Sequence, residues 1–295
     1  LLSRRQRQMC IRDRSLKVVL SGEGADEIFG GYNVYSDPGS TSYEKLPRGL
    51  RRGIMHIAES LPAHRGVNFF VRKGKDLEER FIGNAYMFTP KDRKALLKIH
   101  TNAPDPMAIT KPYYDQVKDQ DDVTKMQYLD LHLWMAGDIL LKADKMSMAN
   151  SLELRVPFLD KEVMALAQRI PTRYRVIHKP SESGGTPYIT KYAMRLAAKK
   201  DTPPQTAKTA AKKKLGFPVP IRVWLKEDTY YNMVKNTFEG NAAQQFFHTE
   251  KLVQLLDDHR AGKADNSRKI WTVYMFLVWY HVYFESDVIP TKPNV

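Results

Sequence analysis

Residues 16–32 read LKVVLSGEGADEIFGGY, and this stretch decides the fold. Residues 16–20 form a short apolar, β-branched run that ends at a Ser-Gly pair, which is typical of a buried parallel strand entering a glycine turn. Residues 26–32 then have helical spacing and end on Gly30 and Gly31. The sequence therefore predicts a strand–turn–helix unit, which is the one clear α/β unit of the chain.

The turn of this unit carries residues suited to a phosphate ligand. Ser21 and Gly22 let backbone amides and carbonyls approach a ligand closely, as phosphate-binding turns require. Glu23, Asp26 and Glu27 follow, and the last two would open the helix, where the macrodipole favours anions. A carboxylate beside a bound polyphosphate normally indicates a magnesium ion between them, because direct contact would be repulsive. A tight turn with a charged N-cap is the purely structural alternative.

A second motif, DILLKADKMSMANSLELRVPFLD, covers residues 138–160. Charges of alternating sign interrupt this mostly apolar segment, at Lys142, Asp144, Lys145, Glu153 and Arg155. Such charges are costly unless they are paired or hold a ligand. Two interpretations stay open, an internal ion-pair network that braces a helix end and a binding wall for a charged substrate. Met146 and Met148 are expected to be core residues.

A third motif, KKKLGFPVP, covers residues 212–220. It ends a lysine-rich stretch, residues 199–214, in which Pro203 and Pro204 predict a mobile loop. Lys214 lies two residues before a Gly-Phe turn, where its side chain could close over an anionic intermediate. The alternative is a solvated basic linker.

Most of the remaining chain has helical patterns. Candidate helices cover residues 43–61, with a break at Pro47, and residues 121–133, 138–148, 160–169 and 190–199. Asp160 is the expected N-cap of the fourth. Residues 270–284 are rich in aromatic side chains and predict a buried core helix. Their length and their charged flanks, Lys269 and Glu285, do not fit a membrane anchor.

Composition narrows the class of protein. The 295 residues are 42% hydrophobic and 27% charged, which is typical of a soluble globular protein with a sizeable core. A net charge of +14 would suit a nucleic-acid-binding or interaction module, but also an enzyme that handles ATP and pyrophosphate. The aromatic residues cluster in an apolar helix instead of alternating with basic residues, which disfavours nucleic acid. The single cysteine, Cys10, excludes a disulfide framework and favours a cytoplasmic location.

Residues 1–14, LLSRRQRQMCIRDR, differ in pattern from the rest of the chain. The segment is similar to translated sequencing-adapter text, and a solvated basic tail is the alternative. We therefore expect residues 1–14 to be non-native or disordered and residues 15–295 to form the folded domain.

The three motifs, together with LEERFIGNAYMF (residues 77–88) and RKIWTVYMFLVW (residues 268–279), resemble the synthetase domain of glutamine-dependent asparagine synthetases. The similarity extends from about residue 15 to residue 285. It implies a truncated ATP pyrophosphatase domain, of the PP-loop or adenine nucleotide alpha hydrolase-like α/β class, with a mostly helical C-terminal part.

The resemblance also implies a reaction and a site. ATP and Mg²⁺ would activate aspartate as β-aspartyl-AMP with release of pyrophosphate, and ammonia from glutamine would displace AMP. Ser21 and Gly22 would bind ATP, Asp26 would bind Mg²⁺, Glu23 would orient or deprotonate ammonia, and Lys214 would neutralise the adenylate and pyrophosphate. Asp144, Lys145, Glu153 and Arg155 would shape the site. The expected partners are aspartate, ATP and ammonia, with no nucleic acid and no membrane; an oligomer stays open.

The sequence departs from the family pattern in two places. The Ser-Gly-Gly-x-Asp-Ser/Thr loop is not found, since Ser183, Gly184 and Gly185 are followed by Thr-Pro-Tyr. The N-terminal glutaminase domain, with its cysteine nucleophile, is not found either. We therefore expect that the chain begins within the synthetase domain and that the 295-residue polypeptide alone makes no asparagine. A β-lactam-synthetase-like or other amidotransferase-type ligase is the alternative within the fold, although Glu23 and residues 138–160 favour asparagine formation.

Overall fold

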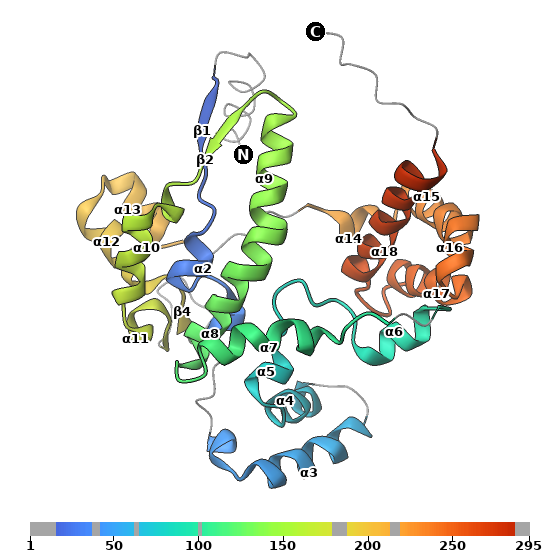
Figure 1. Cartoon of the computed structure of the whole chain (residues 1–295), viewed down its shortest axis with the longest axis horizontal. Helices are drawn as coiled ribbons and strands as arrows, with labels where there is room; N and C mark the ends of the chain where they lie inside the picture. The colour runs from blue at the N-terminus through green and yellow to red at the C-terminus, as the bar shows by residue number, and fades with distance from the viewer. Residues whose placement is uncertain are drawn as a thin grey trace. The chain divides into compact units, whose positions relative to one another are not determined.

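A computed structural model describes residues 16–36, 42–61, 65–99, 102–178, 188–212 and 219–286. The chain forms two compact units, which Figure 1 traces. Unit 1 comprises Leu1–Ala85 and Pro104–Lys214, and unit 2 comprises Tyr86–Ala103 and Leu215–Val295. Three predicted features, residues 1–14, residues 183–185 and Lys214, lie outside the described residues.

Unit 1 is organised around two parallel strands. Strand β1 (Val18–Leu20) pairs with β2 (Glu153–Arg155), and a short turn joins β1 to helix α2 (Ala25–Phe29). Figure 1 shows the two strands side by side, with α2 directly after β1. The predicted strand–turn–helix unit is confirmed. Strand β2 was not predicted, because three residues are too few to show a strand period.

The expectation that the first strand is buried is wrong for one of its faces. The side chain of Leu20 is 75% exposed and Val18 is also exposed, whereas Val19 is partly covered. Among the described residues β1 has a single strand neighbour, so its apolar side chains gain little burial. A second small sheet pairs β3 (Ile177–His178) with β4 (Tyr188–Ile189) in antiparallel order.

Helices make up most of unit 1. They are α3 (Arg48–Glu59), α4 (Arg65–Lys73), α5 (Leu77–Arg80), α7 (Pro106–Gln116), α8 (Asp122–Leu129), the π-helix Asp130–Ile139, α9 (Leu140–Met148), α10 (Lys161–Arg169), α11 (Thr172–Arg175), α12 (Tyr192–Asp201) and α13 (Pro204–Ala210). Short 3₁₀ turns cover Asn33–Ser36, Ser42–Lys45 and Pro157–Leu159. The Asp160 N-cap is confirmed, since its Oδ1 accepts the Glu162 N–H at 2.8 Å.

Three predictions, one about helix boundaries, one about a loop and one about burial, need correction. The two helices predicted at residues 121–133 and 138–148 form one continuous run, because the π-helix bridges them. The predicted mobile loop at residues 199–214 contains α13, which begins at Pro204 because a proline fits the first turn of a helix. Met146 and Met148 are not core residues. Met146 is 61% exposed, because α9 presents both methionines to the surface.

Unit 1 packs around two apolar clusters. The larger one consists of Tyr35, Phe81, Tyr114, Val123, Met126, Leu129 and Val176. The smaller one holds α2, since Ile28 and Phe29 pack against Ala167 of α10. The helix that follows the candidate turn is therefore fixed from its buried side.

Unit 2 is helical throughout its described part. It contains α6 (Pro90–Leu96), α14 (Ile221–Trp224), α15 (Asp228–Glu239), α16 (Asn241–Phe246), α17 (Thr249–Arg260), α18 (Ser267–Tyr280) and the π-turn His281–Glu285. Its core joins side chains from all of these helices except the final turn, including Leu96, Leu225, Phe238, Ala243, Leu252, Leu256 and Ile270. The mostly helical C-terminal part is confirmed.

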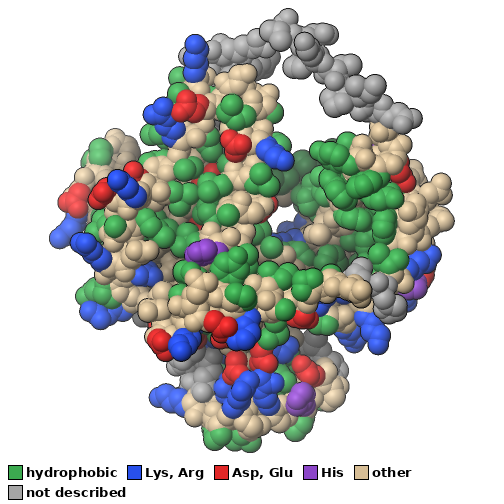
Figure 2. Space-filling view, viewed as in Figure 1, with side chains coloured by type: hydrophobic (Ala, Val, Ile, Leu, Met, Phe, Trp, Pro, Cys, Tyr) green, Lys and Arg blue, Asp and Glu red, His purple; other side chains and the backbone are tan. Residues whose placement is uncertain are grey.

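The aromatic helix α18 is buried on one face only. Ile270, Val273 and Leu277 lie in the core, but Trp279 is 47% exposed and Trp271 is exposed as well. Figure 2 shows a broad hydrophobic patch over this helix. The prediction of a buried core helix is therefore right for its apolar stripe and wrong for its tryptophans. No helix within the described ranges is long and apolar enough to cross a membrane.

Candidate functional site

The turn between β1 and α2 is built from residues of two distant motifs. Ser21 donates its backbone N–H to the carbonyl of Arg155 at 2.8 Å, which continues the parallel ladder past the strand. Gly24 has a φ of +88°, and a Cβ there would lie 2.3 Å from Cδ2 of Leu159. Only glycine fits that position, because the backbone is left-handed and Leu159 occupies the side-chain space. The structure thus brings the first motif against the end of the second.

Glu23 presents a carboxylate with one unbonded oxygen. Its backbone N–H donates to Ser21 Oγ at 3.4 Å, and its Oε2 is buried and has no hydrogen-bond partner among the described residues. Burial raises the pKa of Glu23 above its ordinary value, and the nearby positive charge of Lys142 opposes that shift. Glu23 can therefore accept a proton or a hydrogen bond from a ligand.

Asp26 faces the first residue before helix α12. Its Oδ1 lies 3.0 Å from Nζ of Lys191, and the two side chains are 26% and 22% exposed. A Cβ on Gly31 would lie 1.8 Å from Asp26 Oδ1 and 2.4 Å from Cε of Lys191. Gly31 therefore leaves the room in which the carboxylate and the ammonium meet.

Glu27, the third acidic residue of the turn, is buried and bonded to other parts of the protein. It is buried, it accepts a hydrogen bond from the Tyr32 hydroxyl at 2.5 Å, and its backbone carbonyl accepts one from Gln127 Nε2 at 2.5 Å. Burial raises the pKa of Glu27. Of the three acidic residues, Glu27 is thus buried and anchors α2, whereas Glu23 and Asp26 are partly exposed.

A second buried acid, Asp130, lies at the start of the π-helix. It accepts hydrogen bonds from the Tyr35 hydroxyl at 2.5 Å and from Asn84 Nδ2 at 2.6 Å. Burial raises the pKa of Asp130 to about 7. No part of the sequence analysis assigned a role to this residue, since a single acid inside a helical pattern gives no signal of burial.

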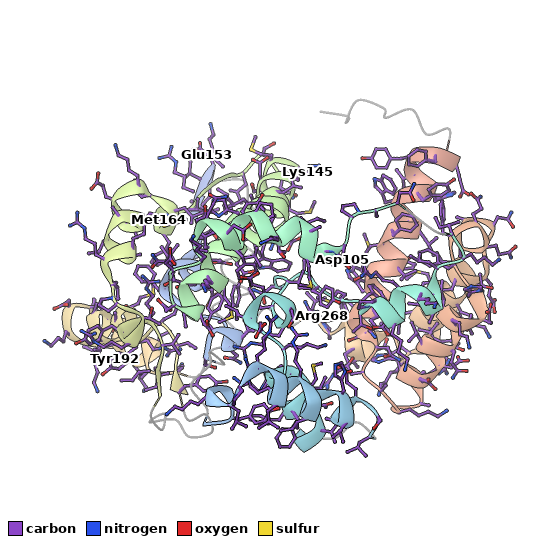
Figure 3. The ribbon with its side chains drawn as sticks, turned by 60° about the horizontal axis from the view of Figure 1, so that its bottom comes forward. Asp105, Lys145, Glu153, Met164, Tyr192 and Arg268 are labelled. Atoms are coloured by element: carbon purple, nitrogen blue, oxygen red, sulfur yellow. The ribbon has the colours of Figure 1, made fainter. Side chains whose placement is uncertain are left out.

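The charges of the second motif lie on the elements that flank the turn. Glu153 Oε1 accepts a hydrogen bond from Arg155 Nε at 2.8 Å, and both side chains are largely exposed. Asp144 and Lys145 are exposed on α9, which packs beside β2. Figure 3 labels Lys145 and Glu153 on these two elements. Glu153 and Arg155 thus form an exposed pair on strand β2, which is not the internal network at a helix end that one interpretation expected. The site-shaping role of all four residues stays a prediction.

Two cations near the turn were not assigned by the sequence analysis. In the sequence, Lys142 is one of several charges of alternating sign, and Lys191 belongs to no motif. Neither carries a local signal, because Lys142 is three residues before Lys145 in a charged helix and Lys191 opens an ordinary amphipathic helix. Only the tertiary fold brings them close to Glu23 and Asp26.

The donor atoms fit magnesium brought in by a polyphosphate better than a resident metal. Within the described ranges no group of three or more His, Cys, Asp or Glu side chains could hold a metal ion. Magnesium is usually bound through one or two carboxylates together with substrate phosphates and water. A single, partly exposed carboxylate such as Asp26 matches that mode.

The strand–turn–helix unit with its parallel strand pair fits the adenine nucleotide alpha hydrolase fold, and the chain belongs to the asparagine synthase family, which has this fold. The family model "Asparagine synthase" matches residues 7–281. The resemblance inferred from the motifs is thus confirmed. Proteins of this family use ATP and have the alpha hydrolase fold, and the described part of this chain has a small parallel sheet and many helices.

Named relatives agree with this family. Asparagine synthetase [glutamine-hydrolyzing] 1 of Bacillus subtilis (strain 168) is 44% identical over 95% of this chain and 42% of its own length. A Mycobacterium tuberculosis (strain H37Rv) protein, provisionally named as a glutamine-hydrolysing asparagine synthetase, is 40% identical over 94% of this chain and 41% of its own. Amidase chyE of Penicillium rubens is 24% identical over 64% of this chain and 30% of its own length. The chain thus spans about two fifths of the length of the first two relatives. No solved structure matches it significantly.

Proposed function

We propose that this chain supplies the ATP-using site of an enzyme that forms asparagine from aspartate, with β-aspartyl-AMP as intermediate and AMP and pyrophosphate as products. Ammonia from glutamine hydrolysis would be the nitrogen donor. The observation that carries the proposal is the turn after β1, which holds the exposed Gly22, the unbonded Oε2 of Glu23 and the carboxylate of Asp26, paired with Lys191, within five residues of the chain.

Ser21 and Gly22 would bind the nucleotide through the backbone. Gly22 is exposed, and no atom lies within 4 Å of the position a Cβ would take. A phosphate or ribose can therefore approach its amide closely, as glycine turns allow. The hydroxyl of Ser21 already accepts the Glu23 N–H, so nucleotide and carboxylate would share one rigid turn.

Glu23 would act on the incoming ammonia. A base works best when its pKa lies close to the working pH, and burial shifts the pKa of Glu23 upward in that direction. Its unbonded oxygen can accept an N–H of ammonia and take up a proton as the amide forms. The nearby positive charge of Lys142 opposes this rise in the pKa of Glu23 and so favours the charged carboxylate.

Asp26 would hold the magnesium ion of the nucleotide, which would offset charge on the phosphates when bound. Lys214, outside the described residues, would neutralise the adenylate and the leaving pyrophosphate from the segment after α13. Asp144, Lys145, Glu153 and Arg155 would shape the aspartate side of the site. A cytoplasmic location fits these soluble substrates.

The test is an assay of the natural gene product with aspartate, ATP, magnesium and either glutamine or ammonia. We expect asparagine, AMP and pyrophosphate in equal amounts. ATP consumption that does not depend on aspartate, or ADP and phosphate as products, would contradict the proposal.

A second candidate keeps the adenylation step and changes the nucleophile, as in β-lactam-synthetase-like ligases. The similarity to a fungal protein that is named as an amidase, and not as an asparagine synthetase, is the observation in its favour. The same assay separates the two, because this candidate forms an adenylate but no asparagine from ammonia, and gives a product only with another amine.

A further inference from the structure

Unit 2 contains a cavity whose lining shares no residue with the candidate site. Its volume is about 520 Å³, which is a usual size for a small-molecule pocket. One wall is formed by α14 and the turn after it, with Arg222, Lys226 and Glu227. The other wall is formed by the end of α17 and the loop that leads to α18, with His259 and Asp265. Both walls therefore present charged or titratable side chains to the same space.

His259 has a buried nitrogen without a hydrogen-bond partner. The residue is 1% exposed, and its Nε2 lies 3.0 Å from the carbonyl oxygen of Arg222. Since a carbonyl only accepts, Nε2 carries the hydrogen of the neutral ring and Nδ1 carries a lone pair. Nδ1 has no partner among the residues that the structure describes. A buried acceptor of this kind is unfavourable unless a donor reaches it.

Asp265 places a second acceptor beside this nitrogen. Its Oδ1 accepts hydrogen bonds from the Ser267 hydroxyl at 2.6 Å and from the Ser267 N–H at 3.2 Å. The hydroxyl bond lowers the pKa of Asp265, so the carboxylate is charged at neutral pH. Oδ1 lies 3.7 Å from His259 Nδ1, which is too long for a hydrogen bond even if the ring is protonated. A ligand with several N–H donors can bond both acceptors.

The wall formed by α14 supplies two cations. Arg222 and Lys226 are exposed, and neither forms an ion pair within the described part of the chain. Lys226 Nζ lies 3.9 Å from the position that a Cβ on Gly262 would take, so its ammonium reaches the loop of the other wall. Guanidinium and ammonium groups bind carboxylates through charge-assisted hydrogen bonds.

The charges of the lining favour a ligand that carries both signs. A phosphate or another simple anion would face the carboxylates of Glu227 and Asp265. A simple amine would face the two cations, Arg222 and Lys226. A metal ion is disfavoured, because no group of three or more His, Cys, Asp or Glu side chains in the described ranges could hold one. A zwitterion has an anionic and a cationic group and so matches both walls.

We propose that this cavity is a binding site for a free α-amino acid. The carboxylate of the ligand bonds Arg222 and Lys226. Its ammonium donates to the carboxylate of Asp265 and to Nδ1 of His259. The ligand then joins α14 to the α17–α18 loop and stabilises unit 2, since it binds the folded state only. The proposal is independent of the reaction assigned to unit 1.

The experiment is calorimetric titration of the natural gene product with L-alanine, L-serine and L-leucine, none of which takes part in the proposed reaction. We expect at least one of them to bind and to raise the midpoint of thermal unfolding. Propionate lacks the ammonium and ethylamine lacks the carboxylate, so each should bind at least about tenfold more weakly than the amino acid.

Two exposed side chains provide the variants. Arg222→Gln and Asp265→Asn should each weaken amino-acid binding at least about tenfold, since each removes one charged contact. Asparagine at position 265 keeps an oxygen that can accept the bonds from Ser267, and the backbone carbonyl of residue 222 still accepts from His259, so both variants should fold. Arg268→Gln is the matched control, because Arg268, labelled in Figure 3, is an exposed arginine of α18 outside the cavity lining. It should leave the affinity unchanged.

Three results would overturn the proposal. None of the three amino acids binds at millimolar concentration; or binding is unchanged in folded Arg222→Gln and Asp265→Asn, which would place the ligand elsewhere; or propionate binds as tightly as the amino acid, which would make the cavity an anion site.

Discussion

The core of unit 2 and the turn of unit 1 use their residues for different purposes. In unit 2, Phe238, Leu252, Leu256 and Ile270 are completely buried and purely apolar. Around the turn the pattern is reversed, because Leu20 is 75% exposed while charged side chains are buried nearby. The difference indicates that unit 2 is arranged for stability, and that the turn gives up stability to hold polar groups in place.

The loss of folding stability in unit 1 can be attributed to a few groups. Asp130 is buried and has a raised pKa, Glu23 has a buried oxygen without a partner among the described residues, and Gly24 has a left-handed backbone. The first two are unfavourable to the folded state by themselves, and the third restricts that position to glycine. Natural proteins break the ordinary rules of packing and polar satisfaction chiefly at functional sites. Substitutions of one group at a time test this difference between unit 2 and the turn.

The largest effect is expected in the core of unit 2. Phe238→Ala removes a fully buried ring from α15 and should lower the free energy of unfolding by about 3–5 kcal/mol. Urea unfolding followed by circular dichroism measures it. Met233→Ala on the same helix is the control, since Met233 is 44% exposed and should cost less than about 1 kcal/mol. Equal losses in the two variants would show that this cluster is not the stabilising core.

A pH effect of comparable size is expected from Asp130. Its pKa rises from 3.8 in the unfolded chain to about 7 in the fold, so the folded state holds the proton over that window. Its contribution to stability should therefore fall as the pH rises from 3.8 to 7, by roughly 4 kcal/mol at most. Asp130→Asn stays neutral throughout and should remove this part of the dependence. Unfolding of both proteins at pH 5 and pH 8 tests it, and identical pH profiles would contradict the raised pKa.

A smaller loss is expected at the turn itself. Gly24→Ala places a Cβ against Leu159 in a left-handed backbone, and should cost about 1–3 kcal/mol. Gly22→Ala is the matched control two residues away, where the space is open, and should change stability by less than about 1 kcal/mol while it weakens nucleotide binding. Urea unfolding and ATP titration measure the two effects. A stability loss at Gly22 as large as at Gly24 would argue that the turn is only structural.

The sequence predicted the parts of the fold that depend on local pattern. The strand–turn–helix unit at residues 16–32, helix α10 with its Asp160 cap and the apolar stripe of α18 all follow from periodicity and capping. Strand β2 and the exposure of Met146 could not be predicted, because both depend on which segment lies alongside in the fold.

The residues of the candidate site also differ in whether the sequence alone could predict them. Ser21, Gly22, Glu23 and Asp26 lie within six residues of the chain, and their roles could be predicted from the motif that resembles the family. Lys191 is separated from Asp26 by more than 160 residues and has no motif of its own, so only the folded chain brings the two together. The carboxylates that have structural roles, Glu27 and Asp130, likewise look no different in sequence from those expected to bind a ligand.

The most direct test of the central claim, that the turn is built for chemistry and not for stability, is Glu23→Gln in the natural gene product. Its ammonia-dependent asparagine formation, its aspartate-dependent ATP–pyrophosphate exchange and its free energy of unfolding should be measured together. We expect asparagine formation to fall about a hundredfold or more, as for a lost general base. Exchange should stay within about threefold and stability within about 1 kcal/mol, since Glu23 is assigned to the ammonia step and has an unbonded oxygen. Full asparagine formation, or a loss of activity matched by unfolding, would contradict the account.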